Sequence, residues 1–568
     1  MDLAQFASAE PAQSKVDTPE VCNEQIVRAL ELDERDRATL LIDDALTRWP
    51  QNARLQLTKG EVLQSCVGPD AAARHYIGLL DGRPAHPWAL QRLRTILSQS
   101  SFSLDEAEAI GTALGEAKLD DPARASVFDA LLKGLDSADQ FAFLRALAPG
   151  SNLLRLEVKL AIAETERGNV ETALDLLLRA HAEGRSNETS TPLLSELLAT
   201  CSREQEAIDL QKREILRNPE RPDPYRRLLS LLQRVGDFKL AGELIQSAIE
   251  RWPNDWMLLF RLNRLPVPPG RLTAIFNVIS PTADQAAQRD ERYRLQFALA
   301  CLHVGEVQRA KDLLAEPFSD VVAPMADPVA KALAAKSNEF WLSGSRLKDD
   351  RTLDVQITRS AGARMTVIVP TGIAFGFLPP AMIDSLFAAH GLNVIYLRDF
   401  RKRAYTLGVA SLGRDEGETI KTLARLTSDL GAPRTITMGG SMGGFAALRY
   451  GALLDAFAAV SFAGPTELVS MYRDTKPSIW NPSYFVKLYL ERRPETPTDV
   501  VPLVQQSGAT FFFQFYGADM PEDARQARRL EGIKNAAVIP IRGVSDHIVI
   551  DHMIADGSFD LLLRRLMN

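Results

Sequence analysis

The chain of 568 residues is too long for a single hydrophobic core, because cores stop growing at about 250 to 300 residues, so two or more domains are expected. With 46% hydrophobic and 24% charged residues, the composition is that of a folded globular protein rather than a disordered or fibrous one. The net charge of -7 gives no electrostatic reason to expect nucleic acid or an anionic membrane as the main partner.

Residues 1–19 are expected to form a flexible N-terminus. They have neither the basic start nor the apolar stretch of a signal peptide, and no later segment offers 18 uninterrupted apolar residues, so neither secretion nor membrane insertion is predicted. The cysteines Cys22, Cys66, Cys201 and Cys301 lie far apart without a C-x-x-C pair, which argues against a disulfide framework or a zinc site. A cytoplasmic location is therefore predicted.

Residues 20–336 are predicted to form amphipathic helices, since apolar residues recur three and four positions apart, as in PYRRLLSLLQRVGDFKLAGELIQSAIERW. Pro50 and Pro84 are 34 residues apart, and so are Pro219 and Pro253. A Gly followed five residues later by Ala occurs at Gly68/Ala73, Gly168/Ala173, Gly236/Ala241 and Gly305/Ala310. Gly permits a tight turn between two helices, Ala lets them approach closely, and Pro ends the second helix.

These features resemble tetratricopeptide repeats (TPRs), most clearly over residues 223–254 and 291–317. The aromatic positions of the repeat are mostly Leu, and residues 100–150 and 265–285 depart from the period. The resemblance implies a helical solenoid whose concave surface binds a protein partner. An irregular helical domain without such a surface is the alternative.

Residues 337–568 are predicted to form an α/β domain, because short apolar runs alternate with helical segments there. The runs are LDVQITRS, MTVIVPT, LNVIYLRDF, TITM, AAVSFAG, ATFFFQFYG and AAVIPIRG. Nearly continuous apolar strands are typical of a parallel sheet covered on both faces. The expected fold class is therefore α + α/β: a multidomain chain with an N-terminal helical solenoid followed by a doubly wound α/β domain.

Ser441 lies at a predicted sharp turn between a strand and a helix. Residues 439–443 read G-G-S-M-G, which fits G-x-S-x-G, and glycines flank such a serine because a side chain there would collide with the neighbouring strand or helix. The string GGSMGGF resembles the nucleophile elbow of the α/β-hydrolase superfamily, in particular its esterase-D and mycolyltransferase-type branch. The resemblance implies that Ser441 is a catalytic nucleophile; a glycine-rich turn for close packing is the alternative.

A serine nucleophile requires a general base, and in this fold the base follows the nucleophile and the acid in the chain. His390 precedes Ser441 and is excluded. His547 follows the last predicted strand and is the predicted base, with His552, five residues further on, as the alternative. The cluster of Asp546, His547, Asp551 and His552 does not have metal-ligand spacing, so no metal is expected.

The acid of a triad orients the imidazole and is expected after the strand TFFFQFYG. Asp519, two residues after Gly517, is the predicted acid, and Asp523 is the alternative. Glu522 ranks third. An acidic residue at position 523 is also explained without catalysis, since it lies in the first turn of a helix.

The oxyanion hole is predicted to use the backbone N–H of Met442 and a second N–H from Gly372 or Ile373, in the loop after MTVIVPT. No His-Gly pair follows that strand, as it does elsewhere in the superfamily, and Gly372 is equally explained as a strand terminator. Residues 466–507 are predicted to form a small cap. Its aromatic and basic residues either line a substrate pocket or pack the cap against the sheet: Tyr472, Arg473, Trp480 and Tyr484.

The combined prediction is a serine esterase or deacylase with a Ser-His-Asp triad, acting on a small acyl ester or an acylated carbohydrate. The helical repeats would recruit a protein partner or a substrate carrier. No cofactor is expected, since no phosphate-binding glycine motif follows a strand. An acyltransferase of the same mechanism and a non-catalytic interaction scaffold are the alternatives.

Overall fold

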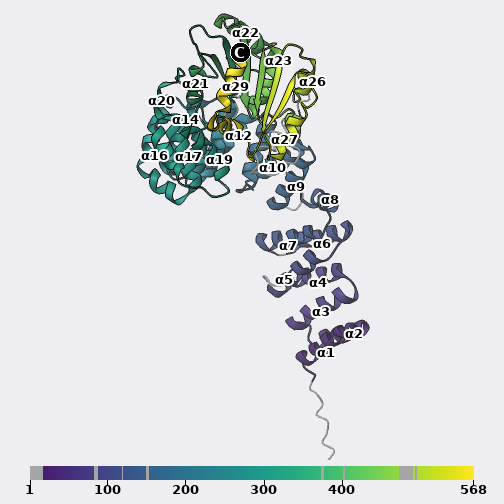
Figure 1. Cartoon of the computed structure of the whole chain (residues 1–568). Helices are drawn as coiled ribbons and strands as arrows, with labels where there is room; N and C mark the ends of the chain where they lie inside the picture. The colour runs from purple at the N-terminus through teal and green to yellow at the C-terminus, as the bar shows by residue number, and fades with distance from the viewer. Residues whose placement is uncertain are drawn as a thin grey trace, which may run out of the picture. The chain divides into compact units, whose positions relative to one another are not determined.

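The computed structural model describes residues 17–81, 87–117, 119–148, 153–371, 376–400, 403–471, 490–492 and 495–568. The chain divides into two compact units, Met1–Thr191 and Pro192–Asn568. The first unit consists of helices. The second contains further helices and a β-sheet, so the later repeats and the sheet belong to one compact unit (Figure 1). The boundary predicted from the sequence, between a helical domain ending at residue 336 and an α/β domain beginning at residue 337, stays a proposal.

Helices precede the first strand throughout the described part of the chain. They are α1 (Pro19–Glu31), α2 (Arg35–Arg48), α3 (Ala53–Cys66), α4 (Pro69–Asp81), α5 (Pro87–Gln99), α6 (Leu104–Glu116), α7 (Asp121–Lys133), α8 (Ser137–Leu147), α9 (Leu154–Glu166), α10 (Val170–Ala182), α11 (Ser190–Thr200), α12 (Glu204–Arg217), α13 (Pro222–Val235), α14 (Phe238–Arg251), α15 (Trp256–Leu262), α16 (Pro269–Arg289), α17 (Glu291–His303), α18 (Val307–Ala315), α19 (Ala323–Ala334) and α20 (Asn338–Ser343).

The turns between paired helices use the glycines that the sequence pattern marks. Gly168, Gly236 and Gly305 have φ angles of 81°, 78° and 85°, a conformation that costs glycine least. Each lies between two helices that contact one another, and Gly236 is the left-handed C-cap of α13. The alanines five positions after these glycines are completely buried, which allows the two helices of each pair to approach closely.

The described residues of the second unit form one seven-stranded sheet in the order β1-β3-β2-β4-β5-β6-β7. Its strands are β1 (Val355–Thr358), β2 (Met365–Thr371), β3 (Asn393–Arg398), β4 (Arg434–Gly440), β5 (Ala458–Phe462), β6 (Phe511–Gly517) and β7 (Ala536–Ile541). Only β1 is antiparallel to its neighbour; the other pairs are parallel. The chain order reverses between β2 and β4, and in open α/β sheets the carboxyl ends of strands at such a point form the ligand site.

Helices cover the two faces of this sheet. They are α21 (Pro380–Ala389), α22 (Glu416–Leu430), α23 (Met442–Leu453), α24 (Leu468–Met471), α26 (Val501–Gln506), α27 (Pro521–Arg528), α28 (Val549–Ala555) and α29 (Ser558–Met567). The strands β2 and β5 are buried along nearly their whole length, which explains why their sequences are apolar without alternation. Helix α23 contacts β2, β4 and β5, so it lies over the centre of the sheet.

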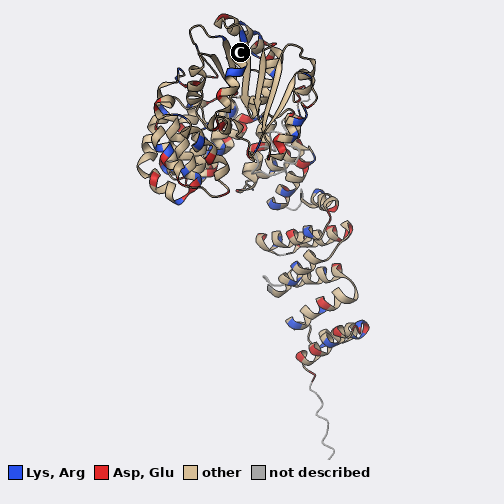
Figure 2. Ribbon diagram, in the orientation of Figure 1, with Lys and Arg blue, Asp and Glu red and all other residues tan. Residues whose placement is uncertain are grey.

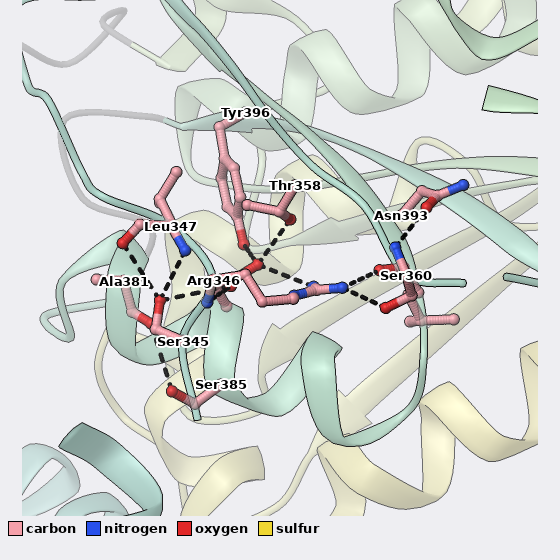
Figure 3. Close-up of polar contacts among 11 residues, drawn as sticks. Ser345, Arg346, Leu347, Thr358, Ser360, Ala381, Ser385, Asn393 and Tyr396 are labelled. Atoms are coloured by element: carbon pink, nitrogen blue, oxygen red, sulfur yellow. Dashed lines mark hydrogen bonds and ion pairs between the residues drawn. The ribbon is translucent and has the colours of Figure 1, made fainter. Parts of the chain in front are cut away.

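The segment that joins the helices to the sheet is held by Asp384, a completely buried residue of α21. Figure 3 shows three residues that contact its carboxylate, Arg346, Thr358 and Tyr396. Its carboxylate accepts hydrogen bonds from the Arg346 backbone N–H at 2.7 Å, the Thr358 hydroxyl at 2.9 Å and the Tyr396 hydroxyl at 3.0 Å. The Arg346 guanidinium forms an ion pair with it at 3.1 Å. These contacts join the segment before β1 to β1, α21 and β3.

Other contacts within the second unit join its repeat helices to the α/β part. Helix α19 contacts α28, the helix that follows the last strand. Arg351, in the segment before β1, donates to the carbonyl oxygens of Leu262 at 3.2 Å and Asn263 at 2.6 Å, at the C-terminus of α15. Lys336 forms an ion pair with Asp560 at 2.8 Å. The repeat helices of this unit are therefore part of the support of the sheet.

Acidic and basic residues are interspersed along the helices of both units, in agreement with the small net charge (Figure 2). The four cysteines are all free thiols. Among the described residues, no helix combines the length and the apolar character needed to cross a bilayer.

Candidate active site

Ser441 occupies a strained turn between β4 and α23. Its φ and ψ angles are 53° and -127°, which L-residues rarely adopt. Its backbone N–H donates to the carbonyl oxygen of Phe462, at the end of β5, at 2.9 Å. The strand-turn-helix setting is the one that a nucleophile elbow requires.

The glycines around Ser441 are required by close backbone contacts. A Cβ atom at position 439 would lie 2.1 Å from the carbonyl oxygen of Gly443, and one at position 444 would lie 2.5 Å from Ser461 Oγ and 2.8 Å from Gly464 Cα. No side chain fits at these distances. The glycines of GGSMGG therefore allow the turn to close and α23 to lie directly on β5.

The first N–H groups of a helix have no partner within it and can bind an anion, and α23 begins directly after Ser441. Within the described part of the chain, the N–H of Met442 forms no hydrogen bond. Gly372 and Ile373, the predicted second donors, lie outside the described residues, as do Tyr472, Arg473, Trp480 and Tyr484 of the predicted cap.

His547 lies in the loop between β7 and α28 and contacts a carboxylate. Its Nδ1 atom is 2.9 Å from Oδ1 and 3.0 Å from Oδ2 of Asp523, whose side chain is 6% exposed, compared with 30% for the imidazole. A buried carboxylate at Nδ1 fixes the ring and leaves Nε2 available to accept a proton. His547 and Asp523 therefore form an imidazole-carboxylate pair at this edge of the sheet.

Asp519, the first choice from the sequence, lies differently. In the turn after β6, the Asp519 N–H donates a hydrogen bond to the carbonyl oxygen of Val544 at 3.0 Å. No hydrogen bond joins its carboxylate to an imidazole among the residues described. Helix α27 starts at Pro521, and its first turn places Asp523 on the buried side. Glu522 instead pairs with Arg525 at 2.6 Å near the surface.

The protonation of His547 depends on opposing influences. Burial, the largest of them, lowers the pKa of the imidazole, but the hydrogen bond and charge of Asp523, together with the charge of Asp546, outweigh it. The pKa of His547 is therefore raised above its usual value of 6.5. A base with a raised pKa accepts a proton readily but is available in neutral form only at higher pH.

The carboxyl edge of the sheet connects Ser441 to the base through backbone hydrogen bonds. Besides the bond from Ser441 to Phe462, the Ala463 N–H donates to Phe515 in β6 at 2.7 Å, and the Ala518 N–H donates to Ile541 in β7 at 2.9 Å. Ser441 and His547 thus lie on the same edge. Among the described contacts, no hydrogen bond joins the side chains of Ser441 and His547.

The other histidines of this half have different partners. His552, the alternative base, lies on α28, and its Nε2 is 2.7 Å from Oδ2 of Asp546. His390 follows α21, and its Nε2 is 2.9 Å from Oδ1 of Asp560. His547 is the histidine that combines a loop position at the carboxyl edge with a buried carboxylate.

Comparison with known proteins gives structural likenesses alone. No protein-family model matches the sequence, and no curated protein matches it. Among solved structures, a carboxylesterase of Nitrososphaera gargenis is 16% identical, covers 37% of this chain and 93% of its own, and has a TM-score of 0.25. Est1E from Butyrivibrio proteoclasticus is 10% identical, with 37% and 93% covered and a TM-score of 0.26.

For the helical region, yeast Tom70 is 12% identical, covers 56% of this chain and 88% of its own, and has a TM-score of 0.27. At these levels the likeness concerns the fold alone. The described part of the chain combines paired helices with a mainly parallel seven-stranded α/β sheet, which is the architecture that the sequence predicts. The site rests on its own geometry.

Proposed function

We propose that the protein is a serine hydrolase that cleaves an ester or acyl group with Ser441, His547 and Asp523. The observation that carries the proposal is the strained Ser441 on the same sheet edge as an imidazole held by a buried carboxylate. Backbone strain of this kind persists where the surrounding structure enforces it, and it is concentrated at functional sites. Asp523 takes the place that the sequence analysis gave first to Asp519.

In the proposed reaction, Ser441 Oγ attacks the acyl carbon and its proton passes to Nε2 of His547. The carbonyl π bond opens, and the N–H of Met442 stabilises the oxyanion that forms. His547 then gives its proton to the leaving oxygen as the C–O bond breaks, which yields an acyl-enzyme. Water, deprotonated by His547, attacks the acyl carbon and releases the acid and Ser441. Asp523 stabilises the protonated imidazole in both stages.

The preferred substrate class is a small acyl ester or an acylated carbohydrate, and the TPR-like helices would recruit a protein partner or a substrate carrier. Helical repeats of this type offer long surfaces on which a partner can bind. The free cysteines agree with a reducing compartment, and we propose the cytoplasm. Transfer of the acyl group to an acceptor hydroxyl instead of water would use the same residues.

Labelling with a fluorophosphonate probe tests the proposal. The wild-type chain should be labelled covalently, and Ser441→Ala should lose at least nine-tenths of the labelling. Ser428→Ala, which changes an exposed serine on α22, should be labelled like the wild type. Equal labelling of the wild type and Ser441→Ala would contradict the proposal. Product analysis with and without acceptor alcohols then separates hydrolysis from transfer.

A further inference from the structure

Three arginines lie together at the C-terminal end of α15. Arg261 is in the last turn of the helix, and the Arg264 N–H donates to the Arg261 carbonyl oxygen at 3.0 Å. Arg351 comes from the segment before β1, and its guanidinium donates to the carbonyl oxygens of Leu262 and Asn263. We call Arg261, Arg264 and Arg351 the α15 arginines. They bring three positive charges to one helix end.

The α15 arginines have no carboxylate partner within the described part of the chain. The Arg261 side chain is half-buried and forms neither a hydrogen bond nor an ion pair there. Arg264 donates to the Phe260 carbonyl oxygen at 3.3 Å, and its guanidinium lies 3.7 Å from the centroid of the Phe260 ring. Arg351 is 8% exposed, and its Nη1 atom is buried without a hydrogen-bond partner. Proteins rarely bury a cation without an anion.

The surrounding arginines differ, because each of them is already paired with a carboxylate. The pairs are Arg226 with Asp255, Arg234 with Glu196, and Arg398 with Asp349. The charges of Arg226 and Arg234 act on Arg261, and the charge of Arg398 acts on Arg351, so these pairs lie close to the α15 arginines. Each carboxylate shares its single charge with its own partner, which leaves excess positive charge at the α15 arginines.

This excess charge is unfavourable in the folded chain. Burial, together with the charges of Arg261 and Arg351, lowers the pKa of Arg264 to about 10. Burial also lowers the pKa of Arg351 to about 10, against the charge of Asp349, and it lowers the pKa of Arg261, against the charge of Glu196. The carbonyl oxygens at a helix end supply only about half a negative charge, and Arg351 already bonds to two of them. A bound anion would remove this cost.

The end of α15 is held in place by the helices on either side of it. Gln233 of α13 donates to the carbonyl oxygen of Arg264 at 3.0 Å, and Asn263 donates to the carbonyl oxygen of Gln296 in α17 at 2.8 Å. Both helices contact α15. The backbone that carries Arg261 and Arg264 is therefore fixed before a ligand binds, which lowers the entropy cost of binding.

We propose that Arg261 and Arg264 bind a phosphate group, either inorganic phosphate or a small phosphate ester, and that the buried Arg351 adds positive charge to the site. A phosphate monoester carries a charge of about -1.5 to -2 at pH 7, which compensates three guanidinium groups better than the single charge of a carboxylate does. Planar guanidinium N–H donors match phosphate oxygens, and stacking on Phe260 fixes the plane of Arg264. The inference does not rest on the proposed function.

The test titrates inorganic phosphate and glucose 1-phosphate separately into the full-length protein by isothermal titration calorimetry at pH 7.5. Sodium chloride keeps the ionic strength constant, and succinate is the carboxylate control. The wild type should bind phosphate, and Arg261→Gln and Arg264→Gln should each weaken that binding at least tenfold. Arg213→Gln, which removes an exposed arginine of α12, should bind like the wild type. Comparing the two phosphate titrations identifies the free ion or the ester as the preferred ligand.

A second measurement separates binding from a purely structural role of Arg261. An arginine that only covers apolar surface stabilises the fold, so its loss would lower the midpoint of urea unfolding without phosphate. We expect Arg261→Gln to have at least the wild-type midpoint, because it removes a half-buried charge without a partner, and to lose the stabilisation that phosphate gives the wild type.

Three results would overturn the inference. They are no binding of either phosphate compound by the wild type at concentrations up to tens of millimolar, equal phosphate binding by the wild type and both variants, and tighter binding of succinate than of phosphate. If Arg264→Gln does not fold, Arg261→Gln decides alone, because the Arg261 side chain makes no bond within the described part of the chain that folding could require.

Discussion

The strain at Ser441 makes a prediction that does not depend on knowing the substrate. Ser441→Gly and Ser441→Ala both remove the hydroxyl, but only alanine keeps a Cβ atom at φ 53° and ψ -127°. A strained conformation of this kind costs a side chain about 1–3 kcal/mol. Glycine loses about 0.5–1 kcal/mol more conformational entropy on folding. The glycine variant should therefore be more stable than the alanine variant by about 0.5–2 kcal/mol.

The assay is equilibrium unfolding in urea, followed by far-ultraviolet circular dichroism. The two compact units need not unfold together, so the comparison uses the transition that both substitutions shift. The matched control is Ser428, inside the helix α22, where alanine should be more stable than glycine by about 1 kcal/mol. If Ser441→Ala is as stable as Ser441→Gly or more stable, the backbone at position 441 is not strained and gives no support for a catalytic role of Ser441.

Four further outcomes are expected. Since the pKa of His547 is raised above 6.5, activity should rise with pH through that higher value. Asp523→Asn removes the carboxylate that raises this pKa, so the acid limb of the variant's pH profile should move to lower pH, and kcat should fall about 10³- to 10⁴-fold. Asp384→Ala should cost about 3–5 kcal/mol in urea unfolding, because it removes the buried carboxylate that pairs with Arg346 and accepts the Thr358 and Tyr396 hydroxyls. Gly444→Ala should cost about 1–3 kcal/mol by overpacking against β5, measured in the same way. Burial raises the pKa of Asp551 from its usual 3.8 to about 7, so the folded wild type loses stability as the pH rises from 4 to 7. Asp551→Asn should therefore be more stable than the wild type at pH 8, by up to about 4 kcal/mol, and about equally stable near pH 4.

The order of helices and strands could be predicted from the sequence because it depends on local patterns. Each of the seven runs named from the sequence overlaps a strand of the sheet, and β2 and β5 are the runs in which burial along nearly the whole strand explains the continuous apolar sequence. The glycines at 168, 236 and 305 could be recognised as turn residues because their spacing repeats. The boundaries of the two compact units could not be predicted in this way. They depend on contacts between residues far apart in the chain, such as Arg351 with the end of α15, and such contacts leave no pattern in the local sequence.

The strained turn at Ser441 could be predicted from the sequence, but the carboxylate that pairs with His547 could be narrowed only to a few residues. Ser441 is recognised because the glycines around it are required by backbone contact, which leaves a mark in the sequence. The choice between Asp519 and Asp523 depends on the path of three residues between β6 and α27, which the sequence does not determine. Pro521 was the available signal, because proline at the start of a helix fixes where its first turn lies.

Asp551 illustrates a different limit. In the sequence it is one of four acidic and histidine residues between positions 546 and 552, a cluster without the spacing of metal ligands. Its contacts depend on Phe377, 174 residues earlier in the chain, and on the absence of a side chain at Gly376. A contact over that distance between a side chain and a backbone amide leaves no spacing rule to detect.

Unfavourable features of the second unit are concentrated at the carboxyl edge of its sheet. Ser441, Ala463, Ala404 and Tyr405 all have positive φ angles of 50–63°, and each lies in a segment that follows one of the strands β3, β4 or β5. Asp551 is buried beside the connection after β2. Each such feature costs on the order of 1–3 kcal/mol, against a total stability of about 5–15 kcal/mol for a typical domain. If the protein is the serine hydrolase proposed above, the cost of Ser441 is explained, because the proposed reaction needs its hydroxyl on the same edge as the imidazole and its carboxylate.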